Sequence, residues 1–138
     1  MKPAYLDHIG IAVTPNSNLA KALAVLGLPI EGNESVDREG VDVEWIALPK
    51  ESGHVELLHP QSPETTIGKF LAKSGRDGIH HLSFRVENIL ETSDRLQAAG
   101  FRLIYSMPKN GANDCLVNFL HPQTTGGVLL EITEKQSK

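Results

Sequence analysis

The sequence contains the stretch LDHIGIAV at residues 6–13, and a related stretch, IHHLSFRV, follows at residues 79–86. Both stretches are short, apolar and bounded by turn residues, which is typical of buried β-strands. Each carries a histidine, and His8 and His81 lie 73 positions apart. A repeat of this kind indicates that the chain is built from two copies of one structural unit.

A glutamate closes each copy of the repeat. Glu56 lies in HVELLHP at residues 54–60, and Glu131 lies in GVLLEI at residues 127–132, 75 positions later. Apolar residues flank both glutamates, so each carboxylate lies in a strand that is expected to be buried. Burying a carboxylate is costly unless it is paired or binds a metal ion, and both glutamates are therefore candidate functional residues.

Both halves of the chain show the same order of predicted elements. Turn residues, apolar periodicity and the stop glycines Gly27 and Gly100 separate the elements. A further helix, starting at Thr65 or Thr66 as its N-cap, is predicted between the halves. In the first half we predict strands over 8–13, 41–48 and 55–58, an extended segment from 29 and a helix over 18–27. In the second half we predict strands over 82–86, 103–106, 116–120 and 128–132 and a helix over 89–99.

This order predicts an α+β protein with two tandem βαβββ modules that form curved mixed sheets around a metal-binding cleft. We expect residues 1–138 to be one domain, with module one at about 5–60, a linker helix at about 63–73 and module two at about 78–133. A doubly wound parallel sheet is excluded because helices and strands do not alternate regularly.

Composition excludes several function classes. The net charge of −4 and the pI of about 5.8 argue against binding to a nucleic-acid backbone. No apolar stretch approaches the roughly 18 residues that a membrane span requires. The single cysteine, Cys115, and a first segment without an apolar core favour a reducing, cytoplasmic location.

Two histidines and two glutamates form a donor set suited to a first-row divalent metal ion. His81 is preferred over its neighbour His80 because it matches His8 in the repeat, and adjacent strand residues point to opposite faces. His54 and His59 lie at strand ends and are interpreted as turn or rim residues.

Several motifs resemble those of the vicinal-oxygen-chelate superfamily and, within it, the methylmalonyl-CoA epimerase family. The motifs are LDHIGIAV at 6–13, ELLHP at 56–60, GKFL at 68–71, GIHH at 78–81, FLHP at 119–122 and GGVLLE at 126–131. The resemblance implies metal ligation by His8, Glu56, His81 and Glu131. It also implies a divalent ion (Co, Zn, Ni or Mn), an acyl-CoA substrate and a homodimer.

The implied reaction removes and returns the proton between a thioester carbonyl and a carboxylate, through an enolate stabilised by the metal. Inversion requires an acid or base on each face of the enolate. Glu131 is one candidate, and Glu44 is a second only if a bulge or a shifted alignment turns it inward. Lys109 and His121 are weaker candidates for substrate contact.

The sequence departs from the epimerase pattern in one loop. Family members commonly carry a second glycine where this chain has Asp114, and a bulkier anionic residue there could disfavour a malonyl carboxylate.

Two alternative functions share the fold. A glyoxalase I-type lactoylglutathione lyase uses the same donor set, whereas a binding protein of the bleomycin-resistance type has usually lost it.

Overall fold

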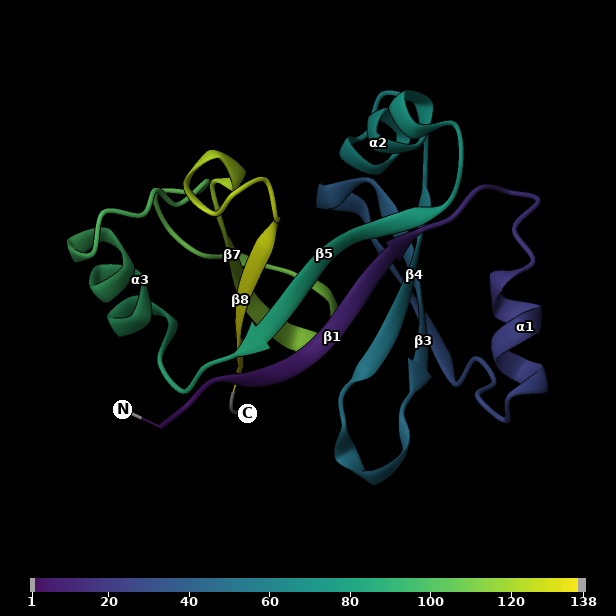
Figure 1. The fold of residues 1–138 in the computed structure, drawn as a ribbon, viewed down its shortest axis with the longest axis horizontal. Helices are drawn as coiled ribbons and strands as arrows, with labels where there is room; N and C mark the ends of the chain where they lie inside the picture. The colour runs from purple at the N-terminus through teal and green to yellow at the C-terminus, as the bar shows by residue number, and fades with distance from the viewer. Residues whose placement is uncertain (1, 137–138) are drawn as a thin grey trace. The chain divides into compact units, whose positions relative to one another are not determined.

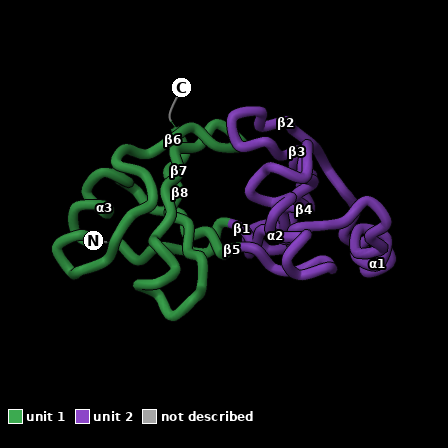
Figure 2. Tube along the Cα trace, turned by 90° about the horizontal axis from the view of Figure 1, so that it is seen from above, with its two compact units in different colours: residues 1–7, 81–138 green, residues 8–80 purple. Residues whose placement is uncertain are grey.

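The computed structural model describes residues 2–136 and has an α+β fold with mixed sheets (Figure 1). The chain divides into two compact units (Figure 2). In chain order, we call residues 8–80 the first unit, which is unit 2 (purple) in Figure 2. The second unit comprises the described residues before His8 together with those from His81 onward, and it is unit 1 (green) in Figure 2. No helix among residues 2–136 has the length and hydropathy needed to cross a membrane.

The first unit contains a mixed four-stranded sheet in the order β2-β3-β4-β1. Strands β1 and β4 are parallel, whereas β2–β3 and β3–β4 are antiparallel. The elements are β1 (Tyr5–Ala12), α1 (Leu19–Val25), β2 (Gly32–Val36), β3 (Val41–Ala47), β4 (His54–Pro60) and α2 (Thr66–Ser74).

The second unit repeats this topology, with the strand order β5-β8-β7-β6 and a parallel β5–β8 pair. The elements are β5 (Gly78–Arg85), α3 (Ile89–Ala98), β6 (Lys109–Asn110), β7 (Cys115–Leu120) and β8 (Leu130–Lys135). The predicted fold class, built from a duplicated βαβββ arrangement, is confirmed in both units.

One predicted strand of the second unit is wrong. Residues 103–106 are predicted to form a strand, but only an isolated bridge between Leu103 and Leu120 forms there, with a hydrogen bond from Ile104 N to Phe119 O beside it. The short β6 lies further along the chain. The side chain of Asn118, which is 1% exposed, accepts a hydrogen bond from Tyr105 N and donates one to Tyr105 O. A side-chain amide thus satisfies the backbone groups that a strand would have paired.

Helix α2 begins as the sequence predicts. The Thr65 hydroxyl accepts a hydrogen bond from Gly68 N, and the helix ends at Gly75 in the left-handed conformation. Gly68 is required by close packing, since a Cβ there would lie 2.4 Å from Ser62 O.

Helix packing determines which strand residues face the core of each unit. Val55 and Leu57 of β4 pack with residues of α1, including Leu19 and Leu23. In the second unit, Leu130 and Ile132 of β8 pack with Ile89 and Leu96 of α3, and Figure 1 shows this helix beside β8. Because successive side chains alternate between faces, the residues between these positions, Glu56 and Glu131, project from the sheet face opposite the helix.

Candidate metal centre and active site

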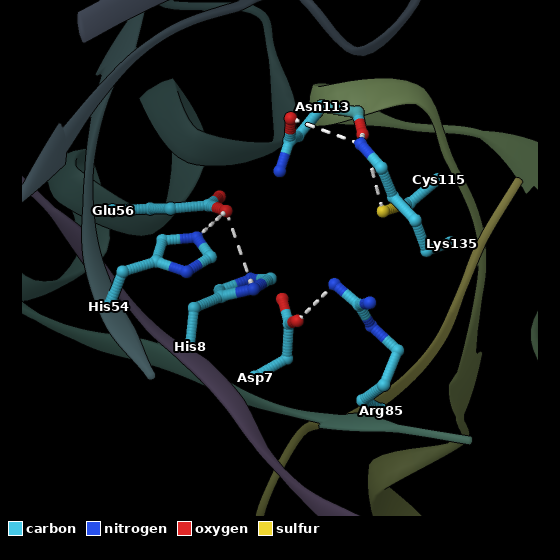
Figure 3. Close-up of polar contacts among 8 residues, drawn as sticks. All are labelled: Asp7, His8, His54, Glu56, Arg85, Asn113, Cys115 and Lys135. Carbon is cyan, nitrogen blue, oxygen red and sulfur yellow. Dashed lines mark hydrogen bonds and ion pairs between the residues drawn. The ribbon is translucent and has the colours of Figure 1, made fainter. Parts of the chain in front are cut away.

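The first unit places His8 and Glu56 together on adjacent parallel strands (Figure 3). Gly10 of β1 is the strand partner of Glu56 in this parallel pair. His8 Nδ1 lies 3.3 Å from Glu56 Oε2, and both residues are buried. The imidazole thus gives the buried carboxylate a polar partner, without which its burial would be costly.

The 3.3 Å separation of these two atoms also suits a shared metal ion. Nitrogen and oxygen ligands lie about 2.0–2.2 Å from a divalent ion such as zinc. Two such ligands at an angle between the octahedral value and the tetrahedral value are therefore about 2.8–3.6 Å apart. The pair fits the donor set that the sequence suggests.

The second unit brings His81 and Glu131 together in the same way. Their donor atoms lie within 4.8 Å of one another, and the side chains project from β5 and β8. Phe119 is paired with Glu131 across β7 and β8, and its ring makes an edge contact with His81 at 5.8 Å. This aromatic contact restrains the imidazole next to the carboxylate.

All four predicted ligands are almost fully buried, with exposed fractions between 5% and 7%. His80 differs from them. Its ring packs edge-on against Phe70, and burial lowers the pKa of His80 to about 4. The adjacent histidines thus have separate environments, as the alternation of side chains along β5 predicts.

Glu44 lies on the opposite face of the first sheet from Glu56. The β3–β4 register is continuous from Val41 to Ala47 and pairs Glu44 with Leu57, a core residue on the α1 face. On that face the Glu44 carboxylate contacts His59 Nε2. The bulge that would turn Glu44 toward His8 and Glu56 is therefore not found in this pairing.

Lys109 and His121, the predicted substrate contacts, have different surroundings in the second unit. Lys109 Nζ lies 4.2 Å from the centre of the Tyr105 ring, a cation–π contact. Tyr105 in turn contacts Phe119 edge-on at 6.1 Å. His121 instead accepts a hydrogen bond from Gln123 N through its Nδ1 atom and caps the short turn that follows β7.

The sequence did not predict three contacts that the structure shows, including that of His54, which was interpreted as a turn or rim residue. Phe119 contacts His81. His54 donates to Glu56, and Arg85 forms an ion pair with Asp7 within the second unit (Figure 3). Asp7 and Arg85 are 78 positions apart, and no local pattern links them.

The loop in which the sequence departs from the epimerase pattern has an unusual backbone. Asn113 and Asp114 both have φ of 56°, in the left-handed region that favours glycine. Lys135 Nζ donates to Asn113 O, and Gln136 N donates to Asp114 O. These hydrogen bonds hold the loop against the end of β8 despite the backbone strain.

We expect Asp114→Gly to stabilise the protein by about 0.5–1 kcal/mol, because glycine adopts this conformation without steric cost. Thermal unfolding followed by circular dichroism measures the effect. Ala112→Gly is the matched control, since Ala112 is not among the residues with positive φ, and this change should destabilise. Equal destabilisation by both changes would contradict the prediction.

Comparison with known proteins identifies the class of this chain. The family model described as "Glyoxalase/Bleomycin resistance protein/Dioxygenase superfamily" matches residues 7–119. Because this match covers most of the chain, the chain belongs to that superfamily.

Relatives narrow the class further. The "Ethylmalonyl-CoA/methylmalonyl-CoA epimerase" of Cereibacter sphaeroides is 39% identical over 132 residues, covering 94% of this chain and 96% of the relative. The crystal structure of methylmalonyl-CoA epimerase from Mycobacterium tuberculosis is 33% identical, with a TM-score of 0.90 over 96% of this chain and 89% of the other. The chain is therefore an isomerase of the methylmalonyl-CoA epimerase family.

One further solved structure contains an acyl-CoA ligand. It is a Streptomyces coelicolor methylmalonyl-CoA epimerase variant in complex with 2-nitronate-propionyl-CoA. It is 27% identical to this chain, with a TM-score of 0.88 over 99% of this chain and all of the other. The similarity thus extends over both units of the repeat.

Proposed function

We propose that this protein epimerises methylmalonyl-CoA by a 1,1-proton transfer that depends on a divalent metal ion. The observation that carries the proposal is the duplicated pair, one buried histidine beside one buried glutamate, on the sheet face opposite α1 in the first unit and opposite α3 in the second. The curated epimerase relatives support the substrate class.

We propose that His8, Glu56, His81 and Glu131 together hold one ion. Two neutral imidazoles and two carboxylates suit cobalt, zinc, nickel or manganese. The ion would act as a Lewis acid for the negative charge that develops on the substrate oxygens. The burial of the four side chains excludes water from the donor atoms and increases the electrostatic effect of each.

Glu131 is the proposed catalytic base. Its carboxylate would take the proton from the carbon between the thioester and the free carboxylate, on one face of the molecule. Inversion is complete when an acid on the opposite face of the enolate delivers a proton to the same carbon. Ring contacts of Phe119 with His81 and Tyr105 form an aromatic wall beside this pair. The contact with Tyr105 positions the Lys109 ammonium, which could pair with an anionic group of an acyl-CoA.

The placement of Glu44 leads to a prediction that distinguishes its role in the reaction from that of Glu131. We expect Glu44→Gln to retain activity within about twofold, since the carboxylate lies on the α1 face and its partner is His59. Weakening this partly exposed Glu44–His59 contact should change stability by less than about 1 kcal/mol. A 100-fold loss of kcat/KM at unchanged stability would instead identify Glu44 as the second base.

The reaction is tested by exchange at the α-carbon. Incubating the protein and a divalent metal with methylmalonyl-CoA in heavy water should incorporate deuterium at that carbon, as followed by mass spectrometry. Turnover of the methylglyoxal–glutathione adduct instead would assign the lyase function.

The family resemblance also implies a homodimer, which light scattering of the purified protein measures.

A further inference from the structure

His54 lies next to the proposed ligands of the first unit but does not belong to the proposed donor set. Its Nε2 atom lies 2.9 Å from Glu56 Oε2 and makes a hydrogen bond with it. Its ring is 5.1 Å from the His8 ring, at an interplanar angle of 32°. Glu56 Oε2 therefore lies between two imidazoles, as Figure 3 shows.

The strand register explains why His54 reaches this position. His54 is the β4 partner of His8 in the parallel β1–β4 pair, so both side chains leave the sheet on the same face. Glu56 follows two residues later on β4 and shares that face. The contact therefore follows from the backbone pairing and does not depend on a flexible loop.

We propose that His54 is a positioning residue that holds the Glu56 carboxylate in place for metal binding. His54 donates its Nε2 hydrogen to Oε2 and limits the rotation of a side chain that otherwise has several freely rotating bonds. A carboxylate that is already oriented loses less conformational entropy when it binds an ion. This role rests on the proposed function, because it requires Glu56 to be a ligand.

The burial of His54 supports a positioning role. Its side chain is 19% exposed, compared with 8% for Glu56, so the hydrogen bond is largely protected from water. Competition by solvent for the carboxylate oxygen is therefore weak. In metal sites, loss of a group that hydrogen-bonds to a ligand typically weakens metal affinity by about 10–100-fold.

The test measures Co²⁺ and Zn²⁺ affinity by chelator competition, together with the absorption spectrum of the Co²⁺-loaded protein. We expect His54→Ala to weaken both metals about 10–100-fold. His54→Gln should restore most of the affinity, because its amide can donate a hydrogen bond to the carboxylate, and its Co²⁺ spectrum should match that of the unmodified protein. In the Glu56→Gln background, His54→Ala should have a much smaller effect.

His59→Ala is the matched control. His59 lies on the same strand as His54, but it faces the α1 side and contacts Glu44. We expect its removal to leave Co²⁺ affinity and the Co²⁺ spectrum unchanged. An equal loss of affinity in His59→Ala and His54→Ala would show a general effect on β4 and would overturn the positioning role.

The outcomes also separate this inference from the proposed function. If His8→Ala and Glu56→Ala lose the ion but His54→Ala binds it normally, the positioning role is overturned and the proposed ligand set stands. If neither His8→Ala nor Glu56→Ala changes metal affinity, the ligand set itself fails. A changed Co²⁺ spectrum in His54→Gln would make His54 a direct ligand and would also overturn the positioning role.

Discussion

Replacing His81 by alanine is expected to abolish metal binding and epimerisation together. The proposed site has one imidazole from each unit, and His81 is buried beside Glu131 and restrained by Phe119. Loss of one of four ligands removes a bond to the ion and leaves a cavity that water can enter. We therefore expect metal affinity to fall by at least about 100-fold, with activity falling in parallel.

The measurement is metal content after gel filtration, combined with deuterium incorporation into methylmalonyl-CoA at a series of metal concentrations. His80→Ala is the matched control, because this neighbouring histidine packs against Phe70. Its removal should affect stability more than metal content. Full activity and full metal content in His81→Ala would refute the proposed ligand set.

Glu131→Gln is expected to lower kcat by about 10²–10⁴-fold even when enough metal is added to saturate the site. The amide keeps an oxygen that can bind the ion, but it cannot accept the α-proton of the substrate. General base catalysis by a positioned side chain typically contributes a factor of this size. The loss should therefore persist at saturating metal.

Glu56→Gln provides the comparison for this prediction. It makes the same chemical change in the glutamate of the other unit, which we assign to metal binding alone. Its metal affinity should fall, but kcat should recover to within about tenfold at saturating metal, because the proton-transfer group is intact. Recovery of full kcat in Glu131→Gln would show that another group removes the proton.

Much of the fold could be predicted because its signals are local. Strand alternation, the Thr65 cap and the stop glycines each lie within a few residues of the element that they define. The predicted strand over 103–106 failed for a non-local reason. The Asn118 amide, which lies 13 positions away from Tyr105, satisfies the backbone there.

The placement of Glu44 was not determined by its sequence neighbourhood. The sequence left open which face of the sheet Glu44 projects from, and the answer required the β3–β4 register. The contacts of His54 and Arg85 likewise could not be predicted from their sequence neighbours. His54 was interpreted as a rim residue, whereas its hydrogen bond to Glu56 follows from the pairing of β1 with β4.

The sequence by itself determined the duplicated βαβββ order and the two histidine–glutamate pairs, because the repeat and the alternation of strand residues can both be recognised in the order of the residues. The tertiary structure decided which other side chains accompany each pair. Such contacts depend on the register between strands, and a shift of a single residue would turn every side chain of a strand to the other face.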